Sequence, residues 1–343
     1  SYGSVYKVRN KLDKKCYVVK RVSRTDPQAT QEISILQRLR HPFIVSYKDK
    51  FEYGDHLCIV MTFCAGGDLY RVIKEMSSQG GLFEETRVLL WFGQLLKAMK
   101  YLHGQKILHR DLKTQNIFLN ADRTVVKLGD FGIAKVLHST SEMALTVIGT
   151  PFYMSPELCQ GIAYSFKSDV WALGCVLYEL CTLQHAFDAK NISQLVLKIM
   201  QGNYPGIPAS YSQDLSDLVD QLLQQDPDRR PSIRAIVASP FMSPVITDIN
   251  KRLTKKTTAS HHHSAPLQRE RPNTGVGDRV GDVTPGAGFQ GVRPQSVPTD
   301  ATPAPSHHAA SHEHPNAPPK RRNFLQWVQR TRQHGETPEP DEG

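Results

Sequence analysis

HRDLKTQN at residues 109–116, followed by DFG at residues 130–132, is the stretch of this sequence that decides its fold. It places Asp111, Lys113 and Asn116 within six residues, and Asp130 follows Asn116 by fourteen. Phosphoryl transfer needs a group that orients the attacking hydroxyl, cations that neutralise the phosphates and a frame that aligns them. A lone HRD triplet would be a chance match, but the two motifs at this spacing indicate a phosphotransferase site.

The side chains of this stretch suit distinct chemical roles. Asp111 is placed to accept the proton of a substrate hydroxyl, and Lys113 can contact the transferring phosphate. Asn116, through its amide oxygen, and Asp130, through its carboxylate, can bind Mg²⁺. Because Mg²⁺ completes its octahedron with water and phosphate oxygens, one Asp and one Asn suffice. We therefore predict Asp111 and Lys113 as catalytic residues and Asn116 and Asp130 as metal ligands.

Upstream of this stretch, residues 1–60 alternate short β-rich runs with turns and contain one helical stretch near residues 31–39. The pattern predicts a small antiparallel sheet with one helix. Lys20 ends a β-rich run, and a strand there would point its ammonium toward the α and β phosphates of a nucleotide. Glu32, the only acidic residue of the helical stretch, is the expected partner of Lys20. The simpler alternative is a surface lysine at a strand edge.

From Asp68, a plausible helix N-cap, the pattern becomes helical. Apolar residues recur at helical spacing on one stripe, namely Val88, Trp91, Leu95, Met99 and Leu102. The most apolar stretch, residues 170–183, spans about half of the ~20 residues that a membrane crossing needs, so we predict a buried helix. The sequence thus predicts an α+β fold with a small β lobe (residues 1–64) and a larger, mainly helical lobe (residues 65–242).

The composition sets broad limits. A chain of 343 residues with 39% hydrophobic residues can bury one large core or two modest ones. The net charge of +9 is spread over the sequence, so no specific nucleic-acid site is expected. The six cysteines show no paired CxxC spacing, which favours buried free thiols in a reducing compartment. The start has no charged region followed by an apolar run, so no secretory signal is expected.

Residues 243–343 form the C-terminal tail, rich in Pro, His, Ser, Thr, Gly and Ala, which we predict to be disordered. Its histidines at residues 261–263 could bind a metal, but solvated histidines are the simpler interpretation. Within the tail, residues 320–332 combine Lys and Arg with Phe324 and Trp327. This segment suits a tail-binding partner or an acidic surface, and a solvated basic patch is the alternative.

Together with these motifs, DVWALG at residues 169–174 and SPE at residues 155–157 resemble the eukaryotic protein kinase family from residue 1 to about 242. Three stretches are similar to the NIMA-related kinases, namely HRDLKTQNIFL (109–119), GTPFYMSPEL (149–158) and IVMTFCAGGDLY (59–70). The resemblance implies a bilobal fold that binds ATP and Mg²⁺ and phosphorylates Ser/Thr hydroxyls of protein substrates. It also implies a cytoplasmic protein linked to the cell cycle and to the cytoskeleton, including centrosomes or basal bodies.

The resemblance assigns further residues to the nucleotide site. Met61 is the expected gatekeeper. Thr62 and Cys64 are the first and last residues of the expected hinge, whose backbone contacts adenine. Val5, Val18 and Phe118 are expected to enclose the adenine ring, with Asp68 near the ribose. A second apolar stack is expected from Leu36, Tyr47, His109 and Phe131. Glu157 is expected to pair with Arg230 and so to fix the substrate-binding segment.

Regulation is expected in the segment between Asp130 and Glu157. Arg110 can pair with a phosphate, so phosphorylation of a hydroxyl there could order the segment. Thr146 matches the activating site of the family, with an unmodified threonine as the alternative. Thr150 is expected to bond Asp111 and Lys113 and to indicate a Ser/Thr preference.

The sequence departs from the family at its start. The nucleotide-covering loop of the family reads GxGxxGxV, and only SYGSV at residues 1–5 matches its end, with Gly3 as the one glycine. Such a chain is expected to bind ATP weakly and to expose a sheet edge, which suggests an incomplete sequence. Two rival functions stay open: a pseudokinase scaffold, disfavoured because Lys20, Asp111, Asn116 and Asp130 are all present, and an adaptor that acts through the tail.

Overall fold

The computed structural model describes residues 4–25, 33–130 and 151–261, with side chains to residue 255. Apart from the last two residues of the final helix, these residues belong to one compact unit. Gly3, Glu32, Phe131, Thr146, Thr150 and the tail beyond residue 261 lie outside the described residues.

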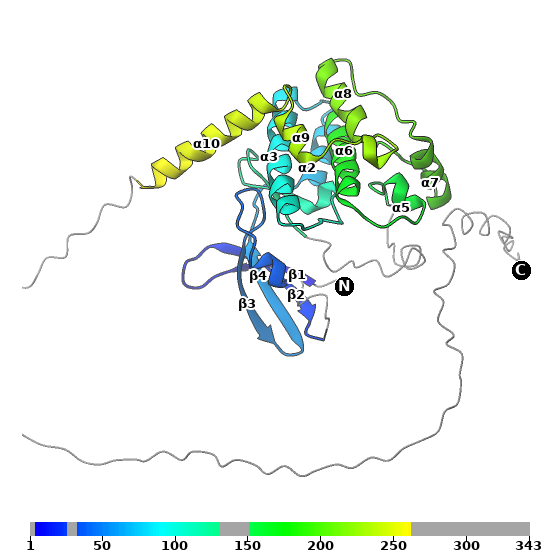
Figure 1. Ribbon diagram of the computed structural model, residues 1–343. Helices are drawn as coiled ribbons and strands as arrows, with labels where there is room; N and C mark the ends of the chain where they lie inside the picture. Colours follow the sequence, from blue (N-terminus) through cyan, green and yellow to red (C-terminus); the bar gives the residue numbers. More distant parts are fainter. Residues whose placement is uncertain (1–3, 26–32, 131–150, 262–343) are drawn as a thin grey trace, which may run out of the picture. The chain divides into compact units, whose positions relative to one another are not determined.

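Four strands form the first sheet, in the order β1-β2-β4-β3, with every pair antiparallel (Figure 1). They are β1 (Ser4–Arg9), β2 (Cys16–Ser23), β3 (Tyr47–Tyr53) and β4 (His56–Thr62). Lys20 pairs with Val5 on one side and with Ile59 on the other, so the three side chains lie on one face. The same face packs on Ile33, which is helical together with the rest of residues 33–36. The predicted antiparallel sheet with its helix is confirmed.

A second, smaller sheet supports the predicted catalytic stretch. It consists of β5 (Gly67–Asp68), β6 (Ile117–Leu119) and β7 (Val126–Leu128). The 3-10 turn η1 (Thr114–Asn116) leads directly into β6, and β7 ends two residues before Asp130. The hairpin of β6 and β7 therefore brings the two ends of the sequence motif to one edge.

The rest of the unit is helical. In chain order it contains α2 (Leu69–Ser78), α3 (Glu85–Gly104), α5 (Pro156–Cys159), α6 (Phe166–Thr182), α7 (Ile192–Gln201), α8 (Gln213–Leu222), η3 (Pro227–Arg229), α9 (Ile233–Ala238) and α10 (Ser243–His261). Asp68 caps α2 by accepting a hydrogen bond from Arg71 N at 2.9 Å, as predicted. The five residues of the predicted α3 stripe are at most 1% exposed.

Helix α6 lies at the centre of the helical part and contacts α3 and α8 (Figure 1). A capping box formed by Ser165 and Ser168 begins it, and its residues are buried from Ser168 to Cys181. A helix that is buried all round needs apolar residues on every face, which explains its continuous hydrophobic sequence. The predicted buried helix is confirmed. None of the described helices is long and apolar enough to span a bilayer.

Helix α10 corrects the predicted boundary of the disordered tail, because residues 243–261 are helical. Ile249 is 2% exposed, and a Cβ added to Gly93 of α3 would lie 2.8 Å from its Cδ1 atom. The absence of a side chain at Gly93 therefore lets α10 approach α3 closely. Composition hid this helix, since only Val245, Ile246, Ile249 and Leu253 provide its apolar face.

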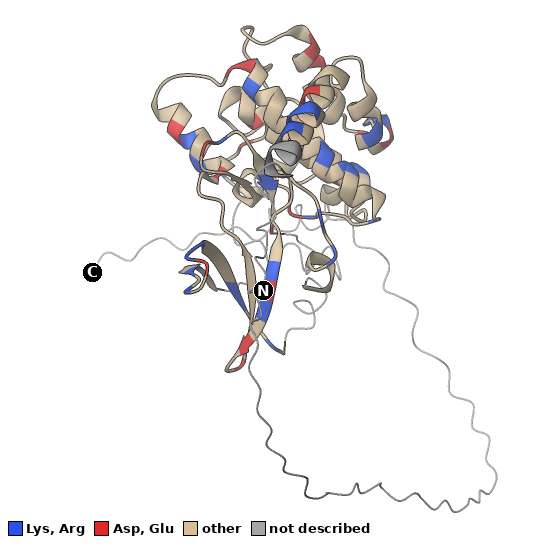
Figure 2. Cartoon of the chain, turned by 90° about the vertical axis from the view of Figure 1, so that its left-hand side faces the viewer, with Lys and Arg blue, Asp and Glu red and all other residues tan. Residues whose placement is uncertain are grey.

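The charged residues are spread over the described part of the chain, and the cysteines are unpaired. Figure 2 shows Lys and Arg interspersed with Asp and Glu over the helices and the sheet. All six cysteines are free thiols, four of them buried and two, Cys16 and Cys64, half-buried.

Candidate active site

Asp111 lies at the centre of the site, in the loop between α3 and η1. Lys113 Nζ lies 3.0 Å from Asp111 Oδ2. Asn116 Nδ2 donates to the backbone oxygen of Asp111 at 2.7 Å and to its Oδ2 atom at 3.0 Å. The structure therefore brings the predicted base, the predicted phosphate-binding lysine and one predicted metal ligand together.

Asp169, from the start of α6, fixes the backbone of this loop. Its buried carboxylate accepts hydrogen bonds from His109 N at 3.1 Å and Arg110 N at 3.2 Å. Arg110 has a φ of 67°, a strained conformation for a non-glycine residue that these two bonds stabilise. The backbone conformation of Arg110, whose side chain is half-buried, is therefore set by a residue about sixty positions away in the sequence.

The same carboxylate accepts from Tyr164 Oη at 2.6 Å and contacts His103 Nε2 at 2.9 Å. Burial favours the neutral acid, but the hydrogen bonds from His103 and Tyr164 outweigh it and lower the pKa of Asp169. Asp169 is thus an ionised anchor. The motif DVWALG contains Asp169 without revealing this role, although an acidic residue inside an apolar helix predicts a buried, paired charge.

His109 is fully buried and links the two motifs. Its Nε2 contacts the backbone oxygen of Gly129 at 3.3 Å, and Asp111 N donates to its Nδ1 at 3.4 Å. Burial lowers the pKa of His109 and outweighs the nearby carboxylates. The neutral tautomer with hydrogen on Nε2 satisfies both contacts.

Lys20 and Asp130 meet across the site. Lys20 Nζ lies 3.7 Å from Asp130 Oδ1. Asp130 is positioned by its neighbour Gly129, whose N–H donates to Asn116 O at 2.9 Å. A Cβ at Gly129 would come within 2.9 Å of Phe118 and Val45, so only glycine fits there. Lys20 therefore points toward Asp130. Its predicted partner Glu32 is outside the described residues.

Four of the residues predicted to surround adenine belong to, or pack against, one small apolar cluster. Met61 belongs to the cluster, and Val18, Cys64 and Phe118 pack against it. Val5 is 60% exposed, on the same face of the sheet as Lys20. Burial raises the pKa of the Cys64 thiol, which keeps it protonated.

The two remaining residues predicted to contact the nucleotide have backbone positions fixed by pairing. Thr62 N donates to Ser46 O at 3.0 Å, and Asp68 pairs with Phe118 between β5 and β6. Asp68 thus lies next to Phe118, which packs against the apolar cluster.

Asp130 and Asn116 are a suitable donor set for a hard cation. The Asn116 amide nitrogen is bonded to Asp111, so the amide oxygen is the group it has left to bind a cation. In the part of the chain that is described, no three His, Cys, Asp or Glu side chains cluster to hold a metal. A cation here would complete its shell with water or phosphate oxygens, as Mg²⁺ does.

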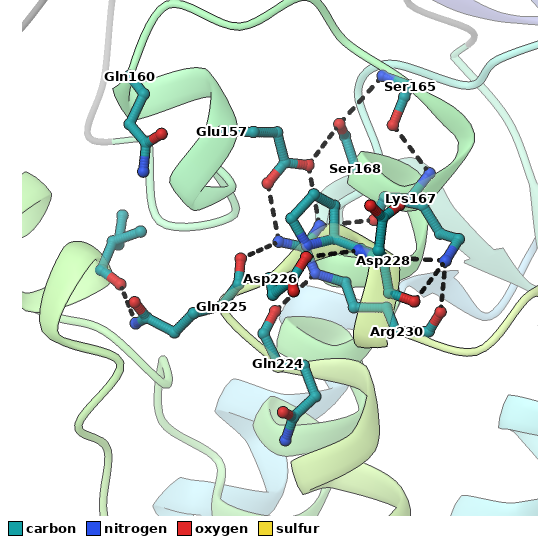
Figure 3. A network of polar contacts seen from close by, with 12 residues as sticks. Glu157, Gln160, Ser165, Lys167, Ser168, Gln224, Gln225, Asp226, Asp228 and Arg230 are labelled. Atoms are coloured by element: carbon teal, nitrogen blue, oxygen red, sulfur yellow. Dashed lines mark hydrogen bonds and ion pairs between the residues drawn. The ribbon is translucent and has the colours of Figure 1, made fainter.

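Glu157 and Arg230 form the predicted buried pair (Figure 3). Arg230 donates from Nη1 to Oε1 at 2.9 Å and from Nη2 to Oε2 at 2.8 Å, and Ser168 Oγ donates to Oε1 at 2.7 Å. Burial favours the neutral acid, but the bonds and charge of Arg230 outweigh it and lower the pKa of Glu157. The pair ties α5, which contains Glu157, to the loop before α9, which contains Arg230.

A second buried carboxylate was not assigned from the sequence. Glu179 of α6 accepts hydrogen bonds from Tyr153 Oη at 2.5 Å and Thr114 Oγ1 at 3.2 Å. Burial and the Glu179 charge raise the pKa of Tyr153 well above its ordinary value, so Tyr153 stays a donor. As for Asp169, the presence of an acidic residue in an apolar stretch of sequence indicates a buried, paired carboxylate.

Comparison with known proteins agrees with this geometry. Residues 1–242 match the family model described as "Protein kinase domain". The mouse serine/threonine-protein kinase Nek1 is 44% identical over 288 residues, covering 81% of this chain and 24% of Nek1. Mouse Nek4 is 45% identical over 286 residues, covering 81% of this chain and 36% of Nek4. The chain thus spans about a quarter to a third of these relatives.

The solved structures include a similar fold. The crystal structure of Rad53 residues 1–466 in complex with AMP-PNP superposes with a TM-score of 0.60 at 32% sequence identity. The match covers 71% of this chain and 62% of that one.

Proposed function

This chain belongs to the protein kinase family, and from that premise we propose that it is an ATP-dependent serine/threonine protein kinase. The observation that supports the proposal best is the convergence of Asp111, Lys113 and Asn116, with Lys20 and Asp130 paired beside them. A pseudokinase scaffold would not need all five groups. The similarity to the Nek kinases and to the AMP-PNP complex of Rad53 points the same way.

The proposed chemistry assigns each group a step. Asp111 accepts the proton of the substrate hydroxyl as the oxygen attacks, and its fixed loop orients that hydroxyl. Lys113 contacts the γ-phosphoryl oxygens, where negative charge is concentrated during transfer. Lys20 contacts the α and β phosphates. ATP is the substrate whose γ-phosphoryl group is transferred, and ADP leaves as the bond to the β-phosphate breaks. Asn116 and Asp130 would bind Mg²⁺, which would neutralise phosphate charge.

The nucleotide would lie against the apolar cluster of the first sheet. Val5, Val18 and Phe118 would enclose the adenine ring, and Met61 would limit the depth of the adenine pocket. The backbone from Thr62 to Cys64 would form hydrogen bonds with adenine. Asp68 would lie near the ribose, and Gly3 and Glu32 complete the proposal from sequence alone.

Regulation by phosphorylation is part of the proposal. Thr146 would receive a phosphate that pairs with Arg110, whose backbone is held by Asp169. Thr150 would contact Asp111 and Lys113, consistent with Ser/Thr substrates. The similarity to the Nek kinases supports a role in the cell cycle or at the cytoskeleton, centrosome or basal body. Residues 320–332 would bind a partner or an acidic surface.

Phosphate transfer tests the proposal directly. The full chain should incorporate phosphate from radiolabelled ATP and Mg²⁺ into casein. Asp111→Asn should lower the rate by roughly 100-fold or more, whereas Asp217→Asn, an exposed change on α8, should not. Equal rates for the wild type and Asp111→Asn would overturn the proposal.

A further inference from the structure

Three segments far apart in the sequence meet at the Glu179 carboxylate, which is 2% exposed. Thr114 Oγ1 donates to its Oε1 at 3.2 Å, and Tyr153 Oη donates to its Oε2 at 2.5 Å. His185 Nδ1 lies 3.6 Å from Oε2. A buried carboxylate needs such donors, because an unpaired charge in the core is costly.

Thr114 and Tyr153 also contact each other. Thr114 Oγ1 lies 3.0 Å from Tyr153 Oη, and Thr114 N donates to the same oxygen at 3.4 Å. Thr114 is fully buried. The two hydroxyls and the carboxylate thus form a triangle of contacts that shares two hydroxyl protons: Tyr153 donates to Glu179, and Thr114 donates either to Glu179 or to Tyr153 Oη. Loss of one hydroxyl therefore leaves the buried Glu179 carboxylate with one donor fewer.

The triangle joins two functional segments. Thr114 follows Lys113 directly and lies three residues after Asp111. Tyr153 lies in the segment that enters α5, and the adjacent Phe152 stacks on His185 with ring centroids 4.0 Å apart. Glu179 belongs to α6, which is buried from Ser168 to Cys181, so it is a rigid point to which both segments are fixed.

We propose that Thr114 is a positioning residue, whose hydroxyl fixes the catalytic loop and the segment around Tyr153 to Glu179 in one mutual register. The inference rests on the proposed kinase function. Asp111 must meet a hydroxyl presented by the substrate, and small displacements of a reacting group lower rates steeply. Thr114 therefore acts through Asp111 and Lys113, without contacting substrate.

The alternative is that Thr114 only fills space in the core. Thr114→Val separates the two, because valine has nearly the shape of threonine but no hydroxyl. With the full chain and casein, Thr114→Val should lower kcat by roughly 10- to 100-fold with little change in the KM for ATP. Thr114→Ser, which restores the hydroxyl, should return kcat to within about threefold. Thr247→Val, which removes an exposed α10 hydroxyl bonded to Ser243 O, is the matched control.

Tyr153→Phe tests the same contact from the other side. It should lower kcat about as much as Thr114→Val does. In the double variant, the fold-decrease in kcat should be much smaller than the product of the two single fold-decreases, because each change disrupts the same triangle of contacts. Thermal unfolding of each variant shows whether the protein is folded at the assay temperature.

The outcomes separate this inference from the proposed function. A wild type as inactive as Asp111→Asn overturns the kinase function itself. An active wild type with a Thr114→Val or Tyr153→Phe variant of normal kcat overturns the role of Thr114 alone, as does multiplicative loss in the double variant. If Thr114→Val does not fold, kcat of Tyr153→Phe decides.

Discussion

Lys20 Nζ lies 3.7 Å from Asp130 Oδ1, which joins the first sheet to the end of β7 across the candidate active site. The lysine comes from β2, where Val18, Lys20 and Val22 share one face of the strand. The Lys20 side chain is only 15% exposed. A lysine this buried beside a carboxylate is positioned for chemistry rather than for solubility.

Replacement of Lys20 should therefore impair turnover. Lys20→Met keeps the length of the chain but removes the ammonium, and we expect kcat/KM for ATP to fall by roughly 100-fold or more. Steady-state kinetics with varied ATP measure the effect. Lys50→Met is the control, because Lys50 lies in the same cross-strand row on β3 but is exposed. Similar losses for both variants would contradict the role of Lys20.

The buried pair of Glu157 and Arg230 should matter for stability. Arg230→Met leaves the Glu157 carboxylate buried without its main partner, and we expect the free energy of unfolding to fall by about 3–5 kcal/mol. Urea denaturation measures it. Arg252→Met, which breaks the exposed pair with Asp248, should change stability by less than about 1 kcal/mol. Equal effects of the two changes would contradict the prediction.

His41 should make stability depend on pH. Burial, followed by the charges of Lys97 and Lys127, lowers the pKa of His41 from 6.5 to about 4. The unfolded chain therefore binds a proton that the folded chain excludes. Because of His41, the free energy of unfolding is highest above pH 6.5 and decreases as the pH falls toward 4. His41→Gln should flatten the decline in unfolding free energy over that range, measured by urea denaturation, and an unchanged slope would refute the assignment.

Helix α10 should contribute to the stability of the domain. Ile249→Ala removes a buried side chain that packs against Gly93, and we expect a loss of about 2–5 kcal/mol in the free energy of unfolding. Gly93→Leu should also destabilise the protein, because its side chain would displace Ile249. Thr247→Ala on the exposed face of α10 should change stability by less than about 1 kcal/mol. An Ile249→Ala protein as stable as the wild type would mean that α10 does not dock in solution.

Much of the fold followed from local patterns. The small antiparallel sheet, the α3 stripe and the buried α6 were predicted, because alternation and helical spacing in the sequence follow the burial of side chains. The strand β3 was not among the β-rich runs that indicated the sheet. The tail boundary was wrong, since α10 has only one apolar stripe in a polar composition and docks through a glycine on another helix. The roles of all the site residues remain predictions, and Glu32, Thr146 and Thr150 also lie outside the described residues.

The sequence by itself determined which groups are proposed to react, because Asp111, Lys113 and Asn116 lie within one short loop and Asp130 follows close behind. Only the tertiary structure decided what fixes them. Asp169 bonds the backbone of His109 and Arg110 from about sixty residues away, and Glu179 joins Thr114 to Tyr153. The physical reason is that a buried carboxylate must find donors wherever packing brings them, and sequence distance does not limit that choice.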